Sequence, residues 1–227
     1  MKLKGLRVLV TGGRGRLGTE LVSLLDEEGA VVSCPSSKQW DITEVFPAFL
    51  KTWCPQLIIH CAAFTDVPGA EKNKIDCINV NVFGTKNISE LAAVMNSRLI
   101  HISSDYVPYR PCGFYAATKW MAEAFIPKEE TIIRTSFKDR GTWGEEGLKG
   151  VFHPVYTNAD WTDIIAAKIV EVIKKDLRGI VNVGTKAKTL RDLAFQEFPD
   201  VEEISVETAD DILGYHYPRD CRMKLTI

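Results

Sequence analysis

A tyrosine and a lysine stand four positions apart in the stretch Tyr115-Ala116-Ala117-Thr118-Lys119. On a helix both side chains project from one face, because residues i and i+4 are neighbours there. An ammonium group near a phenol favours the phenolate and lowers the pKa of the phenol from about 10 towards neutrality. A tyrosine in this setting can exchange a proton with a reacting oxygen. Ordinary surface helices show the same spacing, so the pair needs support from other residues.

A serine, Ser104, follows the apolar run Arg98–Ile102 in the sequence Ser103-Ser104-Asp105. This run is typical of a buried strand, and open α/β sheets bind their ligands at the carboxyl ends of the strands. The Ser104 hydroxyl is therefore expected to bind the same substrate oxygen as the tyrosine. The predicted catalytic residues are Ser104, Tyr115 and Lys119.

A glycine-rich loop, Thr11-Gly12-Gly13-Arg14-Gly15-Arg16-Leu17-Gly18, follows the apolar run Leu6–Val10. The order strand, glycine turn, amphipathic helix is that of a dinucleotide-binding loop. Gly12 permits a sharp exit from the strand, Gly15 lets the backbone approach a pyrophosphate, and Gly18 lets the helix pack closely on the sheet. The helix N-terminus then stabilises the anion.

The residues that follow the strand expected at 30–34 indicate which cofactor is bound. NAD-binding folds place an acidic residue about 20 positions after the glycine loop, where it binds the ribose 2′-hydroxyl and repels a 2′-phosphate. Here positions 33–38 carry no acid, and Ser36, Ser37 and Lys38 offer donors and a positive charge, which Arg14 augments. We predict a preference for NADP over NAD. The alternative is that Arg14 and Lys38 are ordinary solvated charges and that either cofactor is accepted.

The elements that must hold these residues alternate between strand and helix. Apolar runs predict strands at residues 6–10, 30–34, 57–60, 98–102 and 131–134. A helix is expected between each pair of consecutive strands, near 17–25, 45–50, 73–96 and 114–125. This pattern predicts an α/β fold of the Rossmann type, a doubly wound parallel sheet with helices on both faces. We assign residues 1–136 to the dinucleotide-binding domain and 137–227 to a small C-terminal substrate lobe. The lobe, with helices at 161–174 and 190–198 and strands at 179–183 and 202–206, is expected to interweave with the end of the sheet as one compact unit.

The composition is that of a soluble globular protein, with 227 residues, 45% hydrophobic, 26% charged and a formal charge of −2. This charge gives no global attraction to nucleic acid or to anionic membranes. The sequence shows no leader and no apolar run of the ~20 residues that a membrane span needs, so we expect a cytoplasmic protein. The six cysteines and four histidines lack metal-ligand spacing, and we expect reduced thiols and no metal site.

Several motifs together resemble the extended short-chain dehydrogenase/reductase superfamily, and most closely its dTDP-4-dehydrorhamnose reductases. The resemblance runs from about Leu6 to Ser136. It is carried by TGGRGRLG (11–18), Asp41-Ile42, PQLIIHCAAFTDVPGAE (55–71), INVNVFGTKN (78–87), ISSDYV (102–107), YAATK (115–119) and IIRTSF (132–137).

The resemblance implies a role for each matching residue. The tyrosine is the general acid for a carbonyl, the lysine holds the nicotinamide ribose and tunes the tyrosine, and the serine orients the carbonyl. Asn81 supports the sheet, and Phe137 stands where these reductases usually have tryptophan. The remaining implied contacts are the pyrophosphate for Gly15, Arg16 and Leu17, the adenine for Asp41 and Ile42, the adenosine side for Ala62, Ala63 and Phe64, and the sugar for Asp105 and Phe137.

The C-terminal segment offers a candidate for the substrate's diphosphate. Arg219 carries a guanidinium, which can make two parallel bonds to phosphate oxygens. An exposed arginine without a ligand is the alternative.

We therefore expect an NADP-dependent reductase of a nucleotide-linked 4-keto-6-deoxy sugar, using NADPH. Its partner is the nucleotide sugar, and a homodimer is left open. Two features depart from the family: only positions 105–114 separate Ser104 from Tyr115, and the C-terminal lobe is abbreviated. The alternatives are a nucleotide-sugar epimerase or dehydratase of the same superfamily, and a non-catalytic NADP-binding regulatory subunit. Dehydratases carry an adjacent Asp-Glu pair, which Ser103-Ser104-Asp105 does not show.

Overall fold

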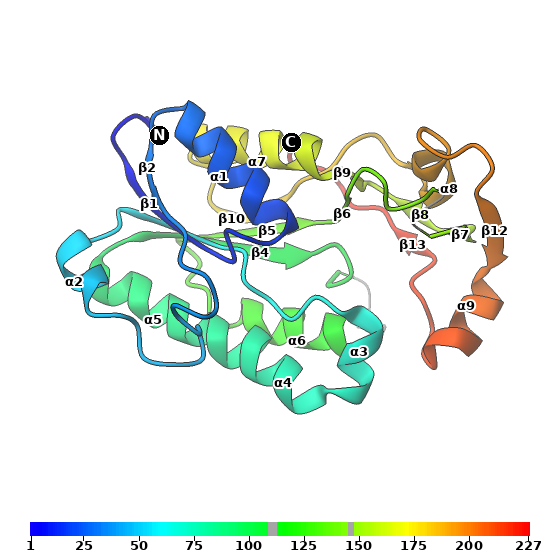
Figure 1. Cartoon of the computed structure of the whole chain (residues 1–227), viewed down its shortest axis with the longest axis horizontal. Helices are drawn as coiled ribbons and strands as arrows, with labels where there is room; N and C mark the ends of the chain where they lie inside the picture. Colours follow the sequence, from blue (N-terminus) through cyan, green and yellow to red (C-terminus); the bar gives the residue numbers. More distant parts are fainter. Residues whose placement is uncertain (109–112, 145–147) are drawn as a thin grey trace.

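A six-stranded parallel sheet forms the centre of the computed structural model, which describes residues 1–108, 113–144 and 148–227 (Figure 1). The strand order is β10-β5-β4-β3-β1-β2. Its strands are short apolar runs, several of them buried on both faces, as a parallel sheet requires. Their bounds are β1 Arg7–Thr11, β2 Val31–Ser33, β3 Leu57–His60, β4 Arg98–Ser104, β5 Thr131–Thr135 and β10 Gly179–Asn182.

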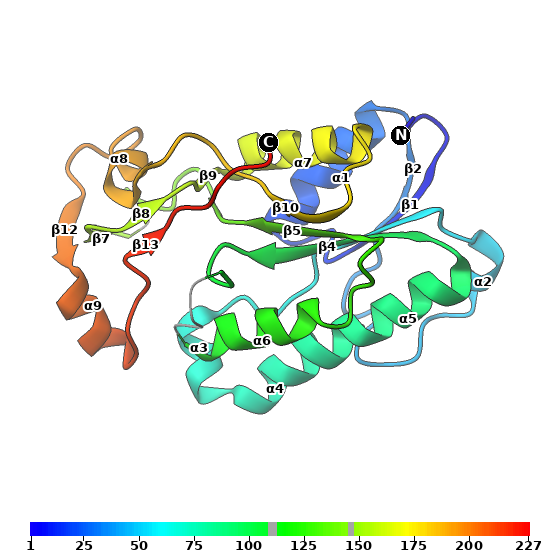
Figure 2. The ribbon, with the colours of Figure 1, turned by 180° about the vertical axis from the view of Figure 1, so that it is seen from behind.

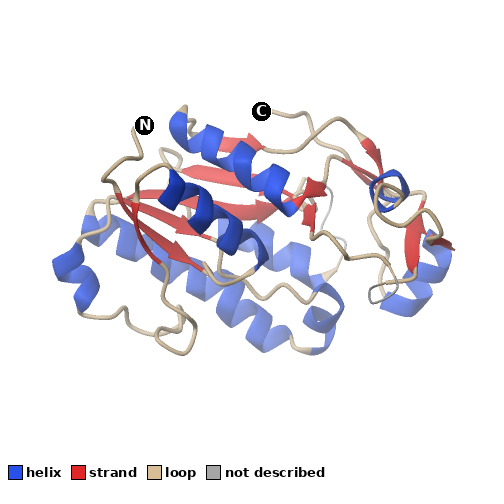
Figure 3. Cartoon of the chain, turned by 45° about the horizontal axis from the view of Figure 1, so that its top comes forward, coloured by secondary structure: helices blue, strands red, loops and turns tan. Residues whose placement is uncertain are grey.

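Helices cover both faces of this sheet (Figures 1 and 3). One face carries α1 (Arg16–Glu27) and α7 (Thr162–Lys174), which pack on Val8, Val10 and Ile59. The other face packs α5 (Thr85–Met95) on Leu9, Ile58 and Leu99. The same layer holds α2 Phe49–Trp53, α3 Val67–Lys72, α4 Lys74–Ile78, the π-helix η1 Asn79–Gly84 and α6 Phe114–Glu123. The predicted doubly wound α/β fold is thereby confirmed.

The chain reverses its winding direction beside β1, whose neighbours are β2 on one side and β3 on the other. Such a switch point leaves a crevice at the carboxyl ends of the strands. The glycine loop leaves β1 there, and Ser104 ends β4 at the same edge.

A small lobe extends from this edge of the sheet (Figure 2). It begins with β6 (Phe137–Lys138), which pairs with β9 (Asp160–Trp161) immediately before α7. Trp143, Trp161 and Leu193 lie in its own apolar core. The lobe also contains β7 Gly150–His153, β8 Tyr156–Thr157, β11 Lys188–Thr189, α8 Leu190–Ala194, β12 Glu202–Ser205, α9 Val206–Leu213 and β13 Asp220–Cys221.

Residues after position 136 also return to the main sheet. The strand β10 pairs with β5, and the amide N–H of Thr226 donates to the carbonyl of Asn182 over 2.9 Å. The residues beyond β5 therefore contribute both a lobe and an edge of the sheet.

The structure differs locally from the expected elements. The helix expected near 45–50 begins only at Phe49, after Pro47, and Val45 is 86% exposed. The long helix expected over 73–96 contains the π-helical turn η1, and α9 was not predicted. In the described parts of the chain, no helix has both the length and the apolarity that crossing a bilayer demands.

Candidate active site

A cavity of about 720 Å³ opens at the carboxyl edge of the sheet, between the glycine loop and the ends of β3, β4 and β5. It brings most of the predicted site residues together. Those in its lining are Gly12, Arg14, Gly15, Arg16, Leu17, Gly18, Ser36, Asp41, Ile42, Ala62, Ala63, Ser104, Tyr115, Lys119 and Phe137. Four others lie outside the described lining: Lys38, Phe64, Asp105 and Arg219.

The glycine loop has the close packing that its residue types predict. Gly12 has φ +67°, and a Cβ there would lie 2.6 Å from the Ala62 nitrogen. A Cβ on Gly18 would lie 2.1 Å from the Gly12 carbonyl oxygen. Gly15 is exposed at the N-cap of α1, beside the cavity. The loop therefore presents bare backbone and a helix N-terminus to the cavity, which fits a dinucleotide pyrophosphate.

Ser104 lies at the last position of β4 and is 7% exposed. Its hydroxyl oxygen accepts from the Tyr106 amide over 3.2 Å and lies 3.4 Å from the Asp105 carboxylate. Asp105 is 1% exposed, and burial raises its pKa to about 7 against the opposing charge of Lys138. The Asp105 carboxyl group, which is partly protonated at neutral pH, therefore lies next to the Ser104 hydroxyl that lines the cavity.

Tyr115 and Lys119 both line the cavity from the first turns of α6. Lys119 is 2% exposed, and its Nζ donates to the Ile102 carbonyl over 2.8 Å. Burial lowers the pKa of Lys119 to about 8, although the Glu123 carboxylate opposes this shift.

The expected lowering of the Tyr115 pKa by Lys119 is wrong in this structure. Burial raises the pKa of Tyr115 above its ordinary value, and the charge of Asp105 adds to the effect. The Lys119 ammonium is directed at the Ile102 carbonyl. The phenol is therefore kept protonated at neutral pH, which is the state that a proton donor needs.

Asn81, in the π-helical turn, ties α6 to the loop after β3. Its side-chain nitrogen donates to the Thr118 hydroxyl over 3.0 Å and to the Phe64 carbonyl over 3.2 Å, and its oxygen accepts from the Phe64 amide over 2.8 Å. π-Helical turns are frequent at functional sites. Asn81 was expected to support the sheet, and its bonds instead join α6 to the loop after β3, where they hold Phe64 by its backbone.

A second anchor of α6, Glu71, is absent from the sequence-based expectations. Its Oε1 accepts from the backbone N–H of Phe114, the first residue of α6, over 2.5 Å. Gly113 precedes it at φ +87°, and a Cβ there would lie 3.1 Å from the same Glu71 oxygen. The contact joins α3 to the residue next to Tyr115, and no motif spacing signals it.

Lys138 also lines the cavity and was missed. It follows Phe137 in β6, and this position beside a predicted site residue is the one signal that could have found it. Its neighbour Asp139 forms an ion pair with Arg16 of the glycine loop, with 3.5 Å between Nε and Oδ2. This pair connects the loop to the start of the lobe.

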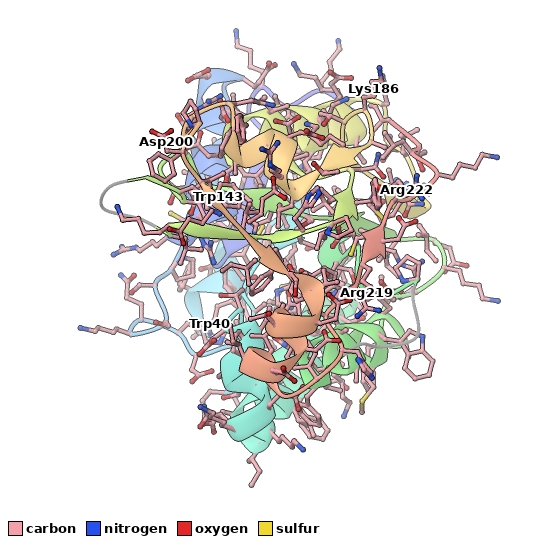
Figure 4. The ribbon with its side chains drawn as sticks, turned by 90° about the vertical axis from the view of Figure 1, so that its right-hand side faces the viewer. Trp40, Trp143, Lys186, Asp200, Arg219 and Arg222 are labelled. Carbon is pink, nitrogen blue, oxygen red and sulfur yellow. The ribbon has the colours of Figure 1, made fainter. Side chains whose placement is uncertain are left out.

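Arg219 lies outside the cavity, on the outer face of the lobe beside α9 (Figure 4). Its guanidinium pairs with Glu207 over 3.2 Å and with Asp210 over 3.5 Å. Lys38 is exposed. Among the described residues, no group of three or more His, Cys, Asp and Glu side chains is arranged to hold a metal ion.

The sheet, the glycine loop and the Ser104, Tyr115 and Lys119 cluster define a dinucleotide-binding protein of the extended short-chain dehydrogenase/reductase class. Residues 6–142 match the family model described as RmlD substrate binding domain. The chain belongs to this family.

Curated relatives carry names from sugar-nucleotide reduction. The dTDP-4-dehydrorhamnose reductase of Mycobacterium tuberculosis (strain ATCC 25618 / H37Rv) is 34% identical over 161 residues, which cover 62% of this chain and 53% of the relative. The dTDP-4-keto-6-deoxy-D-glucose reductase of Streptomyces niveus is 28% identical over 228 residues, which cover 85% of this chain and 77% of the relative. The match thus spans about half the length of the mycobacterial relative.

A solved structure shows the same fold. The dTDP-4-dehydrorhamnose reductase from Bacillus anthracis, in complex with NADP, superposes with a TM-score of 0.82 at 23% identity and covers 98% of this chain and 90% of that chain.

Proposed function

We propose that the chain is an NADPH-dependent reductase of a nucleotide-linked 4-keto-6-deoxy sugar, of the dTDP-4-dehydrorhamnose type. The observation that carries the proposal is a single cavity of about 720 Å³ lined by the glycine loop and by Ser104, Tyr115 and Lys119. The names of the mycobacterial and Streptomyces relatives support the substrate class.

The residues present fit a dinucleotide cofactor. The bare backbone at Gly12 and Gly15 and the N-terminus of α1 would hold the pyrophosphate, while Ile42, Ala62 and Ala63 line the adenosine end. The Asp41 carboxylate accepts from the Thr43 amide and hydroxyl over 2.9 and 2.8 Å, so a local turn uses it.

A preference for NADP is part of the proposal. Positions 33–38 at the end of β2 carry no acid, and Ser36 and Arg14 line the cavity. The B. anthracis enzyme with this fold was solved with NADP. The discriminating measurement is kcat/KM with NADPH against NADH, in the wild type and in Arg14→Ala with Lys38→Ala. A wild type that favours NADH contradicts the preference.

NADPH, when bound, supplies the hydride that adds to the carbonyl carbon. Tyr115 holds the proton that passes to the carbonyl oxygen, and its raised pKa keeps that proton in place until the oxygen becomes basic. The Ser104 hydroxyl lines the same cavity and orients the carbonyl by a hydrogen bond. The buried Lys119 ammonium adds positive charge near the oxygen on which negative charge develops.

One observation favours a second candidate, an NADP-binding subunit without turnover. The Lys119 ammonium, which the family's mechanism uses at the ribose and the tyrosine, donates here to the Ile102 carbonyl. In that reading the cavity binds cofactor and the chain acts through a partner protein.

The test is the oxidation of NADPH in the presence of dTDP-4-dehydrorhamnose. Stoichiometric NADPH loss and a reduced nucleotide sugar support the reductase. NADPH binding without turnover contradicts the reductase and leaves the binding subunit.

A cytoplasmic location is part of the proposal, because the described cysteines Cys34, Cys54, Cys61, Cys77 and Cys221 are free thiols. A homodimer stays a prediction.

A further inference from the structure

Lys138 brings a positive charge to the part of the cavity where the chemistry is expected. It lines the same cavity as Ser104, Tyr115 and Phe137. Burial lowers the pKa of Lys138, and the charge of Arg16, in the glycine loop, lowers it further. The charges of Asp105 and Asp139 oppose this shift. The ammonium group is therefore within electrostatic range of the glycine loop and of Asp105, the neighbour of Ser104.

Two carboxyl groups, those of Asp105 and Asp139, act on this ammonium group, and each of them is shared with another partner in the described structure. The Asp139 carboxylate pairs with Arg16, and the Asp105 carboxyl group is hydrogen-bonded by Ser104 and has a pKa of about 7. The Lys138 Nζ lies over the face of Trp143, 6.0 Å from the ring centroid. Lys138 is half-buried, and withdrawing a cation from water is costly where its counter-charges are shared, which favours an anion from a ligand at this point.

The backbone of Lys138 is held firmly by its neighbours. It pairs with Trp161 across β6 and β9, and its carbonyl accepts from the Thr162 hydroxyl over 3.1 Å. The side chain thus starts from a backbone position that the fold sets, on the lining of the cavity.

The substrate's chemistry supplies an anion at the required distance. A 4-keto sugar nucleotide carries its diphosphate at the anomeric carbon, one sugar ring away from the carbonyl that Tyr115 must reach. The backbone N–H groups of the α1 N-terminus and Arg16 would hold the cofactor pyrophosphate. Arg219, the sequence-based candidate for the diphosphate, is occupied by Glu207 and Asp210 outside the cavity.

We infer that Lys138 binds the diphosphate of the nucleotide-sugar substrate and so selects for a substrate with an anionic group one ring away from its carbonyl. This inference rests on the proposed function, because it presumes a nucleotide sugar in the cavity.

The test measures binding and requires no turnover. Calorimetry on the intact chain gives Kd for dTDP-glucose, which lacks the keto group, for thymidine, which lacks the phosphates, and for NADPH. We expect Lys138→Met to weaken dTDP-glucose binding about tenfold or more, with the Kd of NADPH and of thymidine changed less than about twofold. Lys138→Arg keeps the charge and should retain most of the affinity. Added salt should weaken the wild type more than Lys138→Met.

The matched control is Lys186→Met, which removes an exposed lysine of the lobe outside the cavity and changes the net charge equally (Figure 4). Unchanged dTDP-glucose affinity in Lys138→Met overturns the inference, and so does a loss confined to NADPH, which would assign the cation to the cofactor. A wild type that binds NADPH but not dTDP-glucose contradicts the proposed function itself. Retained NADPH binding shows that each variant is folded.

Discussion

At the scale of single residues, burial sets the protonation states around the cavity. It raises the pKa of Asp105 to about 7, raises that of Tyr115 and lowers that of Lys119 to about 8. Each shift favours the neutral form, as expected where charged groups leave water. The corner around Ser104 is therefore less charged than its residue types indicate.

Tyr115→Phe removes the proton donor and little binding surface. We expect kcat to fall about 10²–10⁴-fold, with the Kd of NADPH nearly unchanged. Steady-state rates and calorimetry on the same preparations measure both. Tyr156→Phe is the control, because this tyrosine is exposed in the lobe and lies outside the cavity. If Tyr115→Phe turns over like the wild type, the tyrosine is not the acid.

Asp105 predicts a pH dependence of stability. Its carboxyl titrates near 7 in the folded chain and near 3.9 when unfolded, so between these values the folded chain binds one more proton. The free energy of unfolding then decreases as pH rises from about 4 to 7, and the lost stability is not regained above 7. Asp105→Asn lacks this decrease. Urea unfolding of both chains at several pH values should show the wild type losing up to a few kcal/mol relative to the variant, and parallel profiles would contradict the argument.

At the scale of elements, the helix α6, which carries the proposed proton donor, is held at two points. Asn81 bonds to Thr118 on its second turn, and Glu71 accepts from the Phe114 amide at its first residue. The residue that must be positioned, Tyr115, lies directly between these anchors. The π-helical turn η1, which contains Asn81, places that side chain against α6.

Glu71→Ala should release the start of α6. Losing a charged acceptor from a helix N-terminus costs about 1–2 kcal/mol, so we expect a lower Tm and a lower kcat with an unchanged Kd for NADPH. Glu71→Gln keeps an acceptor oxygen and should restore most of kcat. Equal losses of kcat in the two variants would show that the hydrogen bond to Phe114 does not position the tyrosine.

The sequence predicted the elements whose pattern is local and missed those that depend on packing. The strands around Ile58, Ile100 and Ile133 are continuous apolar runs, and they occur where expected. The helix α9 begins at a Ser205 cap and has only eight residues, so its apolar pattern is short. Ser104, Tyr115 and Lys119 could be selected by type and spacing. Glu71 could not, because only the fold brings it to the site, and the one signal for Lys138 was its position next to Phe137.

At the scale of the whole molecule, the cavity is shared between the sheet and the lobe. Ser104 and Tyr115 come from the sheet side, while Phe137 and Lys138 belong to β6, which pairs with β9 ahead of α7. The helix α7 packs beside α1, which begins at the glycine loop (Figure 3). The start of the lobe is thus built onto the cofactor-binding part of the fold, and the ion pair of Arg16 with Asp139 lies at this junction.

In this ion pair, the Asp139 carboxylate competes with the phosphate group of an arriving cofactor for the Arg16 guanidinium. Arg16 must release the carboxylate before it can bind the phosphate. The pair is largely exposed, at 56% and 37%, and such pairs are worth less than about 1 kcal/mol. Asp139→Asn should therefore tighten NADPH binding by less than about fivefold at low salt, with the difference vanishing at high salt. Asp163→Asn, which removes a partner of Arg140, is the control. An unchanged or weaker affinity in Asp139→Asn would refute the exchange. The Asp139 carboxylate should also increase the rate at which the oxidised cofactor dissociates, as measured by stopped flow. This surface contact then sets how long the cofactor stays bound and does not change the rate of the chemical step.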